Sequence, residues 1–490
     1  MSRPKEQSAL SFDDDTLHEE CGVFGIFGHD DAGALAVLGL HALQHRGQES
    51  VGVVTYDGAQ FIAERHLGLV GDVFGKNNAH AQKLRGRHAL GHVRYSTTGG
   101  TTIRNVQPMF ADLAAGGIAL AHNGNLTNAV ALRDELVHAG AIFQSTSDTE
   151  TIIHLVARSA YDPILDKLID ALKQVQGAYS LVGLTSKKLI GARDPFGVRP
   201  LVLGELDGAP ILTSESCALD IIGASFVRDV EPGEVIVASK EGLDSYFPFS
   251  KQPERFCIFE YIYFARPDSV VEGRNVYEVR KRIGEELARE YPVDADMVIP
   301  VPDSGVPAAL GYANAARLPF ELGIIRNHYV GRTFIEPSDR IRHLGVRLKH
   351  NPNRAQLRGK RVVLVDDSIV RGTTSKKIVQ MVRDAGATEV HFRIASPPTT
   401  HSCFYGVDTP NRQDLLAHRM SVEEMRQFIN ADSLAFISME ALYRAMGETG
   451  RDAVRPQFCD ACFSGDYPIE LTDVDGGRKG AQLSLLAEVS

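Results

Sequence analysis

The sequence predicts a chain of two domains, and the C-terminal one is predicted to be an α/β domain built on a doubly wound parallel sheet. The first observation is length, because 490 residues with 43% hydrophobic side chains are enough for more than one buried core. The second is Val362–Val365, an aliphatic run typical of a parallel strand buried on both faces. The third is a helical period over Ser375–Val382, which follows that strand after a turn of small residues.

The turn between this strand and this helix carries groups that bind ligands. It opens with Asp366 and Asp367 and continues through Ser368, Gly372 and Thr373. In open α/β sheets ligands bind where the strands end, and helix N-termini favour phosphate through free N–H groups. Paired carboxylates suit sugar hydroxyls or a divalent cation. The alternative is an ordinary strand-to-helix turn, and a Walker loop is a poor match because its Gly-x4-Gly-Lys-Ser/Thr spacing is missing.

The full string from Val363 to Thr374 resembles the phosphoribosyl pyrophosphate loop of type I phosphoribosyltransferases. The resemblance implies that Asp366 and Asp367 hold the ribose hydroxyls. It also implies that the following residues cradle the 5′-phosphate: Ser368, Ile369, Arg371, Gly372, Thr373 and Thr374.

Composition excludes several classes of protein. The net charge is −10 and no basic face is evident, so a nucleic-acid partner is not expected. A membrane span is not expected either, because no apolar run reaches roughly 18 residues. The first 20 residues are polar and lack the apolar core of a secretory signal. Six cysteines in a chain of this length are not a disulfide scaffold, so a cytoplasmic protein is predicted.

The N-terminal half carries a cysteine at the start of a strand-like segment. Cys21–Gly28 alternates apolar residues with glycine, and a lone cysteine in such a place is usually a small buried hydrophobe. Four further segments follow in order, namely His45–Ser50, Gly91–Thr97, Ala121–Leu126 and Ser147–Glu150. The set resembles the N-terminal-nucleophile glutaminase domain of glutamine amidotransferases, over about residues 21–240. The resemblance implies two facing sheets with flanking helices, an αββα fold, in a domain predicted over 21–253.

Glutamine hydrolysis requires a nucleophile, a base and an oxyanion site. Thiolate is the most nucleophilic side chain near neutral pH. A free α-amino group, with a pKa of about 7.7–8.0, can act as the base beside its own thiol. Cys21 can supply both groups only after the Glu20–Cys21 bond is cut, so residues 1–20 are predicted to be a disordered propeptide.

The same resemblance assigns the other groups of the glutaminase site. Asn123 and the backbone N–H of Gly124 form the oxyanion hole. Arg94 binds the α-carboxylate of glutamine in a two-pronged pair, and Asp148 binds its α-ammonium group. Structural ion pairs are the alternative for Arg94 and Asp148.

Tight turns and then a crossing to a second domain are expected after this site. Asp194–Gly197 is a turn signature, and Cys217 is expected to be buried and unreactive. Prolines and turn residues up to 253 predict a boundary there, followed by the phosphoribosyltransferase domain over 254–411. Val276–Arg289 has helical periodicity within it.

Met297–Pro307 is predicted to be a strand followed by a loop with several prolines and a glycine, and it resembles the pyrophosphate loop of the same transferases. That resemblance implies that Ser304, Asp366 and Asp367 lie around Mg²⁺. Mg²⁺ suits this role because it is a hard cation that keeps waters and bridges phosphate oxygens. A plain turn serine is the alternative for Ser304.

The stretch from Asn327 onward is rich in cations: Arg332, Arg340, Arg342, Arg347 and Lys349. The composition alone fits a solvated basic loop. The resemblance implies a mobile flap that closes over the substrate and completes an ammonia tunnel. One departure stands out, because the family commonly shows Lys-Asn-Arg where this chain has Arg326-Asn327-His328. The third position becomes titratable, which bears on nucleotide inhibition.

The C-terminal part is predicted to be a helical segment over 412–475, followed by a disordered tail over 476–490. Ser421 has the character of a helix cap. Four cysteines from separate segments are candidate metal ligands: Cys257, Cys403, Cys459 and Cys462. Sulfur-only ligation fits a [4Fe–4S] cluster or zinc equally, and ordinary buried thiols are a third alternative. The iron–sulfur members of the family, which also have a cleaved leader, favour the cluster, in a structural role.

The whole chain thus resembles the amidophosphoribosyltransferases of the iron–sulfur type. The resemblance implies transfer of ammonia from glutamine to 5-phosphoribosyl 1-pyrophosphate, giving 5-phosphoribosylamine, glutamate and pyrophosphate. This reaction is the first committed step of purine synthesis. Purine nucleotides as feedback inhibitors and a homo-oligomer, a tetramer, are also implied.

Two other functions use the same motifs. A nucleobase phosphoribosyltransferase with an idle N-terminal domain would keep its activity without Cys21. A non-enzymatic sensor of phosphoribosyl pyrophosphate would need no nucleophile and would release no pyrophosphate. The presence of Cys21, Asn123-Gly124 and Asp148 argues against both. A glutamine-dependent sugar isomerase would share only the first half and would lack Asp366-Asp367 with its loop.

Overall fold

The computed structural model describes residues 18–19, 21–75, 79–95, 102–327, 350–409 and 411–475. The chain folds into two compact units. The N-terminal unit consists of His18–Tyr277, Ser402–Thr409 and Asp452–Ser490, and the C-terminal unit includes residues 278–401 and 410–451.

Two antiparallel sheets form the N-terminal unit. The seven-stranded sheet has the order β12 (Ser225–Asp229), β10 (Val202–Leu206), β11 (Ala209–Thr213), β2 (Gly22–Phe27), β5 (His88–Arg94), β3 (Ser50–Tyr56) and β4 (Phe61–Leu67). The six-stranded sheet has the order β14 (Gly242–Tyr246), β13 (Val235–Ser239), β9 (Lys188–Arg193), β8 (Gly177–Thr185), β7 (Gly116–Leu126) and β6 (Met109–Leu113).

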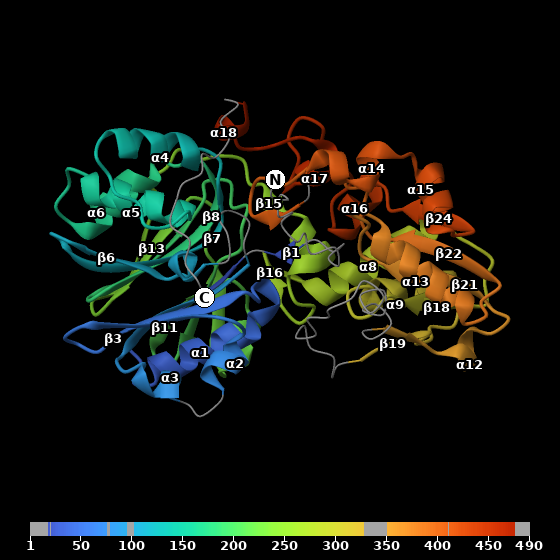
Figure 1. Cartoon of the computed structure of the whole chain (residues 1–490), viewed down its shortest axis with the longest axis horizontal. Helices are drawn as coiled ribbons and strands as arrows, with labels where there is room; N and C mark the ends of the chain where they lie inside the picture. Colours follow the sequence, from blue (N-terminus) through green and yellow to red (C-terminus); the bar gives the residue numbers. More distant parts are fainter. Residues whose placement is uncertain are drawn as a thin grey trace, which may run out of the picture. The chain divides into compact units, whose positions relative to one another are not determined.

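Helices cover the outer faces of these sheets, so the unit has four layers (Figure 1). Helix α1 (Ala32–Ala42) packs on β2, β5 and β3, with α2 (Val70–Phe74) and α3 (Ala79–Lys83) beside it. On the other side α5 (Asp148–Arg158) packs on β7 and β6, next to α4 (Ala129–His138) and α6 (Ile164–Leu172). This αββα arrangement confirms the predicted fold.

Apolar side chains fill all three spaces between the layers. Val23 and Leu90 of one sheet share a buried cluster with Ala121 and Val182 of the other. Small residues allow the sheets to approach, because a Cβ on Gly25 would lie 2.8 Å from the Leu189 side chain. Gly25 of β2 therefore has a packing reason.

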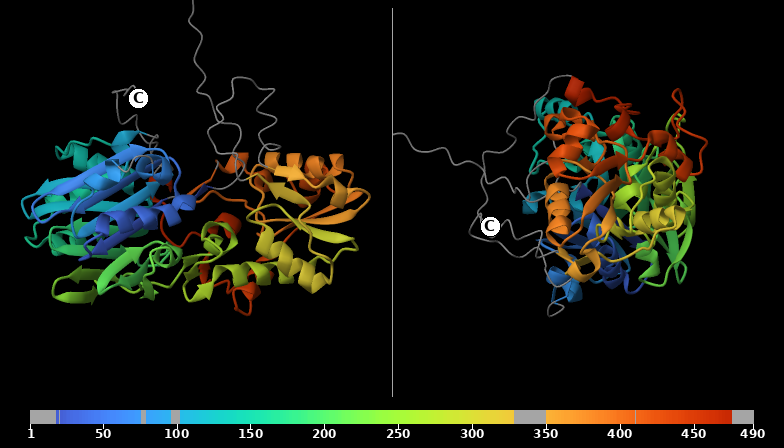
Figure 2. Two further views of the ribbon diagram at one scale, coloured as in Figure 1. Left: turned by 90° about the horizontal axis from the view of Figure 1, so that it is seen from below. Right: turned by 90° about the vertical axis from the view of Figure 1, so that its right-hand side faces the viewer.

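A parallel sheet forms the C-terminal unit, with the order β18 (Met297–Pro300), β21 (Arg361–Asp366), β22 (Glu389–Ile394) and β24 (Ser433–Phe436). Helices α13 (Thr373–Asp384) and α15 (Val422–Ile429) cover one face, where their side chains share a core with Val362 and Leu364. Val363 and Val365 alternate to the opposite face and are fully buried, and α9 (Val306–Ala316) contacts β18 and β21. Figure 2 shows this sheet with helices on it, which confirms the doubly wound prediction.

Three structural observations differ from the expectations for chain organisation. The segment predicted to be helical over 412–475 contains β24, because the short apolar run Ser433–Phe436 extends the parallel sheet beside β22. The N-terminal unit includes residues up to Tyr277, past the predicted boundary at 253, and the Cys257 N–H donates to the Val198 carbonyl oxygen of that unit at 3.1 Å. Within the predicted leader, His18–Glu19 form a short strand, β1, that pairs with β23 (Val407–Asp408). The predicted tail lies outside the described residues.

Candidate functional site

Cys21 lies immediately before β2, a central strand of the seven-stranded sheet. Its side chain is 7% exposed and its φ is 63°, in the left-handed region that residues with side chains rarely adopt. The thiol donates a long hydrogen bond to the Tyr95 carbonyl oxygen at 3.9 Å. Gly22 pairs with Val93, so Cys21 faces the end of β5, where Arg94 lies. Arg94 is buried, with 4% of its surface exposed.

Asn123 reaches this place from the facing sheet. The residue lies in β7 and is fully buried. Its Nδ2 donates to Ser214 Oγ at 3.5 Å, and the same oxygen accepts from the Val23 N–H at 3.0 Å. Ser214 therefore connects the predicted oxyanion residue with the strand that begins after Cys21. The Asn123 Oδ1 atom is buried and has no hydrogen-bond partner among the described residues.

Gly124 is required by the close approach of its neighbours. Its φ is +134°, and a Cβ would clash with the Ala178 carbonyl oxygen of β8. Gly124 and Tyr179 are register partners in the β7–β8 pair. No larger residue fits this backbone without a shift of the strands.

Asp148 begins α5, whose N-cap Ser147 accepts from the Thr149 N–H. The Asp148 carboxylate accepts a hydrogen bond from the Leu126 N–H at 3.1 Å and lies 3.6 Å from His122 Nδ1. Burial raises the pKa of Asp148, but His122 and the Leu126 and Thr149 N–H groups outweigh it and hold that pKa below its ordinary value. The carboxylate is therefore ionised and available to a cationic group.

Ser214, His92 and His122 are polar residues of this region to which the sequence motifs assigned no role. His92 Nε2 lies 3.2 Å from the His122 carbonyl oxygen. Burial, together with the charge of Arg94, lowers the pKa of His92 to about 3, so the imidazole is neutral. His92 and His122 stand inside the predicted segments, whereas Ser214 is distant in sequence and no pattern pointed to it.

The second predicted site lies in the C-terminal unit, where β21 ends. Asp366 and Asp367 are 8% and 7% exposed, and the Asp367 N–H donates to Asp366 Oδ1 at 3.0 Å. Ser368 Oγ donates to Asp367 Oδ2 at 2.6 Å. The carboxylates thus lie at the carboxyl end of a parallel strand, the edge at which such sheets bind ligands.

The loop then turns sharply into α13. Ile369 is 2% exposed and anchors the loop in the core. Gly372 has a φ of +78°, and a Cβ on it would lie 2.5 Å from Leu416. The N-cap residue of α13 is Gly372, which has no side chain to cap the helix, and the first turn contains no acidic residue. Together with Thr373 and Thr374, this helix end suits an anion.

The loop that contains Ser304 runs beside this one. Val301 N–H donates to the Val365 carbonyl oxygen at 2.8 Å, because β18 and β21 are parallel neighbours. Ser304 is half-buried, and Gly305 starts α9. The Asp303 carboxylate in this loop forms an ion pair with Arg326, the first residue of the atypical Arg326-Asn327-His328 string. His328 and the basic stretch after it lie outside the described residues.

The four candidate cysteine ligands come together in the N-terminal unit. Cys257 of β15 (Phe256–Cys257) pairs in register with Cys459 of β25 (Phe458–Cys459). Cys462 lies in α17 (Ala461–Ser464), and the Cys403 Sγ accepts from the Tyr405 N–H at 3.4 Å. All four are free of disulfides. Burial raises the pKa of Cys257 to about 12, with Cys403 contributing, and the same causes hold the pKa values of Cys459 and Cys462 well above their ordinary range.

The spacing of these thiols tests which group they fit. Among the described residues, the one set of three or more ligand atoms lying mutually within 4.8 Å is Glu64, His66 and His80, so no three of the four sulfur atoms are that close. A tetrahedral zinc ion with Zn–S distances of about 2.3 Å would hold its sulfur atoms about 3.8 Å apart. A sulfur-only set in which Cys257 and Cys459 are buried and Cys403 and Cys462 are partly exposed has the donor chemistry of a thiolate-bound metal centre.

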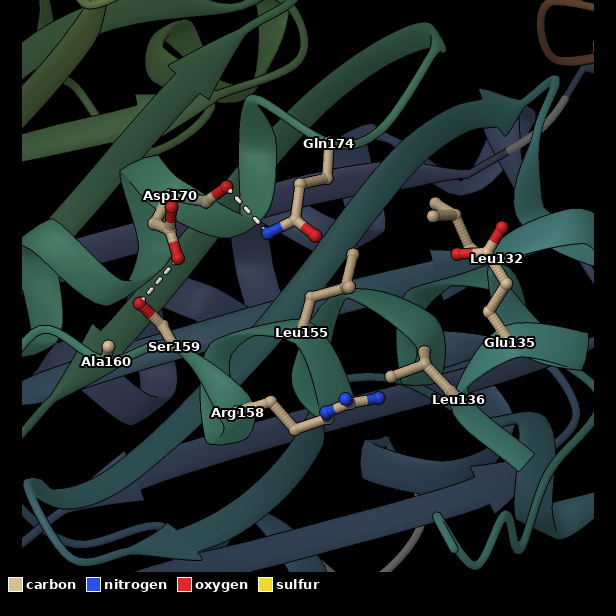
Figure 3. A pocket seen from close by; sticks show the side chains of 9 residues that line it. All are labelled: Leu132, Glu135, Leu136, Leu155, Arg158, Ser159, Ala160, Asp170 and Gln174. Atoms are coloured by element: carbon tan, nitrogen blue, oxygen red, sulfur yellow. Dashed lines mark hydrogen bonds between the residues drawn. The ribbon is translucent and has the colours of Figure 1, made fainter. Parts of the chain in front are cut away.

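A hollow of about 260 Å³ lies among α4, α5 and α6 (Figure 3). Ser159 Oγ donates to Asp170 Oδ2 at 2.7 Å, and Gln174 Nε2 donates to the Asp170 carbonyl oxygen at 3.1 Å. None of the predicted site residues lines it. The hollow is therefore separate from the glutaminase residues.

In the described part of the chain, no helix is both long and apolar enough to span a membrane.

The fold and these two groups of residues define the chain as a glutamine amidotransferase joined to a phosphoribosyltransferase. Comparisons with protein families agree. Residues 92–220 match the glutamine amidotransferase domain, and residues 268–395 match the phosphoribosyl transferase domain.

Individual relatives extend the likeness over nearly the whole chain. An amidophosphoribosyltransferase of Rhizobium etli is 60% identical over 97% of this chain and 97% of its own. That of Bacillus subtilis is 50% identical over 93% of this chain and 95% of its own. The solved structure of B. subtilis glutamine phosphoribosylpyrophosphate amidotransferase complexed with ADP and GMP has a TM-score of 0.87, at 48% identity, and covers 92% of this chain and 98% of that chain. The chain belongs to the amidophosphoribosyltransferase family.

Proposed function

We propose that the protein transfers ammonia from glutamine to 5-phosphoribosyl 1-pyrophosphate, giving 5-phosphoribosylamine, glutamate and pyrophosphate, as the first committed step of purine synthesis. The observation that carries this proposal is the presence of two complete residue sets in one chain. The N-terminal unit holds Cys21, Asn123 and Asp148 in connected positions. The C-terminal unit holds the carboxylate pair and the phosphate-type loop at one strand end.

In the glutaminase half, removal of residues 1–20 gives Cys21 a free α-amino group, which takes the thiol proton as sulfur attacks the glutamine carboxamide carbon. The oxyanion that forms is held by Asn123 and the Gly124 N–H. The α-amino group then returns the proton to the leaving nitrogen, and ammonia departs. Water hydrolyses the thioester to glutamate and restores the thiol.

Two charged residues orient the glutamine during these steps. The ionised carboxylate of Asp148 takes the α-ammonium group, and Arg94 takes the α-carboxylate. Little of either side chain is exposed, so their charges act in a medium of low dielectric constant.

In the transferase half, ammonia forms a bond to C1 of the sugar as the C1–O bond to pyrophosphate breaks. Asp366 and Asp367 hold the ribose hydroxyls, and the loop from Ser368 to Thr374 holds the 5′-phosphate at the N-terminus of α13. Ser304, Asp366 and Asp367 would hold Mg²⁺, which neutralises charge on the departing pyrophosphate when it is bound. Charge develops at C1 in an oxocarbenium-like transition state, so a preorganised, shielded site matters more than a strong base.

The four grouped cysteines hold a [4Fe–4S] cluster with a structural role. The thiols belong to three separate segments, at Cys257, Cys403 and Cys459–Cys462, and all lie in the N-terminal unit. The cysteines would bind the cluster as thiolates, and ligation would offset the burial that otherwise raises the pKa of Cys459. Purine nucleotides inhibit the enzyme, a proposal supported by the B. subtilis structure solved with ADP and GMP. The cytoplasmic location and the tetramer stay predictions.

The test is pyrophosphate release by the purified, metal-replete enzyme offered the sugar donor with glutamine or with ammonium. The wild type is expected to use both nitrogen sources. A Cys21→Ala variant, expressed in a chain that starts at position 21, is expected to lose the glutamine reaction and keep the ammonium reaction. Asp367→Asn is expected to lose both.

Each rival function gives a different result. A sensor releases no pyrophosphate in any sample. A nucleobase phosphoribosyltransferase with an idle N-terminal domain shows no difference between the wild type and Cys21→Ala. Either result overturns the proposal.

A further inference from the structure

A group of metal-ligand side chains lies at the edge of the seven-stranded sheet, on β4 and α3. Glu64 and His66 are two residues apart on β4, so their side chains leave the same face of the strand. β4 is the last strand of the sheet, with β3 as its single neighbour. The short helix α3 brings His80 and Lys83 to the same face.

The ligand atoms converge on one carboxylate oxygen. His66 Nε2 lies 2.8 Å from Glu64 Oε2, and His80 Nδ1 lies 2.7 Å from the same oxygen. The two imidazole rings are close, with centroids 4.3 Å apart. All three ligand atoms lie within 4.8 Å of one another.

Burial and charge leave this set ready to bind a cation. The Glu64 side chain is 10% exposed, while those of His66 and His80 are 31% and 38% exposed, so solvent reaches the imidazole side. The Glu64 carboxylate already contacts three donor groups, since Oε2 lies near both imidazoles and Oε1 lies near Lys83 Nζ.

We propose that Glu64, His66 and His80 form a binding site for Zn²⁺ or a similar divalent transition-metal ion. Two imidazole nitrogens and a carboxylate oxygen are ligands that such ions prefer, and water would complete the coordination. Metal–ligand distances of about 2.0–2.2 Å place tetrahedral ligand atoms about 3.4 Å apart, so the two oxygen–nitrogen spacings of 2.8 and 2.7 Å need to open by less than about 1 Å. The bound ion joins α3 to the exposed edge strand, a role separate from the proposed catalysis.

Replacement of Lys83 distinguishes a metal site from a group held by hydrogen bonds and salt bridges alone, because the two predict different changes in zinc affinity. Its Nζ lies 2.8 Å from Glu64 Oε1 and repels a cation on the other oxygen. Lys83→Met is therefore expected to tighten zinc binding several-fold, although it removes an ion pair. If Glu64 only forms salt bridges and binds no metal, Lys83→Met leaves the zinc affinity unchanged.

The experiment uses the enzyme with its own metals in place and Zn²⁺ as the probe. In crystals soaked with zinc, anomalous difference density at the zinc edge is expected between the Glu64 carboxylate and the two imidazoles. The position of the peak separates this site from any thiol-bound zinc. Soaked crystals with zinc peaks elsewhere and none at this position overturn the proposal.

Calorimetric titration with Zn²⁺ measures the affinity. His66→Ala and His80→Ala are each expected to weaken this binding event tenfold or more, and both positions are half-exposed, so the fold tolerates them. His138→Ala is the matched control, because His138 is an exposed histidine on α4 whose Nδ1 lies 2.7 Å from the Asp134 carbonyl oxygen. Equal zinc affinity in all three variants contradicts the proposal.

Discussion

Cys257 and Cys459 are register partners in two short parallel strands, although one stands near the middle of the chain and the other near its end. The Ile258 N–H donates to the Cys459 carbonyl oxygen at 3.1 Å, so main-chain hydrogen bonds hold the two cysteines in place. Phe259 and Phe463 stack beside them with ring centroids 5.7 Å apart. Main-chain pairing and aromatic packing therefore fix the backbone positions of these two proposed cluster ligands.

The first prediction concerns this group of thiols. Cys459→Ala is expected to lose most of the bound iron and the broad brown absorbance, because one buried ligand of the sulfur-only set is missing. Its melting temperature is expected to fall as well, since a bound group stabilises only the folded state. Iron analysis, the visible spectrum and thermal unfolding measure these effects.

The matched control for that variant is Cys217→Ala. Cys217 is also buried, and burial, with the nearby Glu215 carboxylate, raises the pKa of its thiol. Because Cys217 lies outside the cysteine group, its replacement is expected to leave iron content unchanged. Stoichiometric zinc with no iron in the wild type would contradict the cluster assignment.

The second prediction concerns Asn123. Asn123→Ala removes a side-chain donor from the proposed oxyanion hole, and loss of one such donor lowers kcat by roughly 100- to 1,000-fold. The loss is expected in kcat for the glutamine reaction, with a small change in KM and none in the ammonium reaction. Steady-state kinetics with both nitrogen sources separates these quantities.

Asn128→Ala is the control for this experiment. Asn128 is another buried asparagine, but its amide bridges the Gln174 carbonyl oxygen at 3.0 Å and the Gln176 N–H at 2.9 Å. Its loss is expected to lower stability and to leave kcat with glutamine near that of the wild type. A similar fall in kcat for both asparagine variants would show that general loosening, rather than a lost donor, is responsible.

The third prediction compares two glycines of β7. Gly124→Ala and Gly116→Ala both place a side chain at positive φ, which costs about 1–3 kcal/mol. At Gly124 the new Cβ also clashes with the Ala178 carbonyl oxygen, whereas at Gly116 it meets nothing within 4 Å. Gly124→Ala is thus expected to show the larger fall in melting temperature and to lose the glutamine reaction. Equal effects of the two variants would mean that backbone strain alone matters at Gly124.

Local patterns predicted the parts of the chain that depend on neighbours in sequence. The β21–loop–α13 unit was predicted because an aliphatic run, two carboxylates and a helical period follow one another directly. Ser421 caps α15 as expected, with Glu424 completing a capping box. The αββα fold and the family came from motif resemblance, and the comparisons confirm them.

Contacts between distant segments could not be predicted in this way. The buried Arg46 guanidinium bonds with Glu215 and, at 2.6 Å, with Glu260, so three separate segments share one charge network. Ser214, which contacts both Asn123 and Val23, is likewise distant from them in sequence. β24 was missed because four residues are too few to show a strand period, and only the free edge of the parallel sheet determines its conformation.

The last prediction is a pH dependence of stability at Asp229. Burial, together with the nearby Glu272 carboxylate, raises the pKa of Asp229 from 3.8 to about 6. The folded state then holds a proton that the unfolded state releases between pH 3.8 and about 6, so the free energy of unfolding falls as pH rises through this window. The upper limit of the loss is about 3 kcal/mol, because one pKa unit corresponds to about 1.4 kcal/mol.

Asp229→Asn stays neutral and is expected to gain melting temperature relative to the wild type as pH increases from 4 to 7. Asp244→Asn, on the exposed strand β14, is expected to show no such trend. A constant difference between Asp229→Asn and the wild type across this range would place the ionisation of Asp229 below the window.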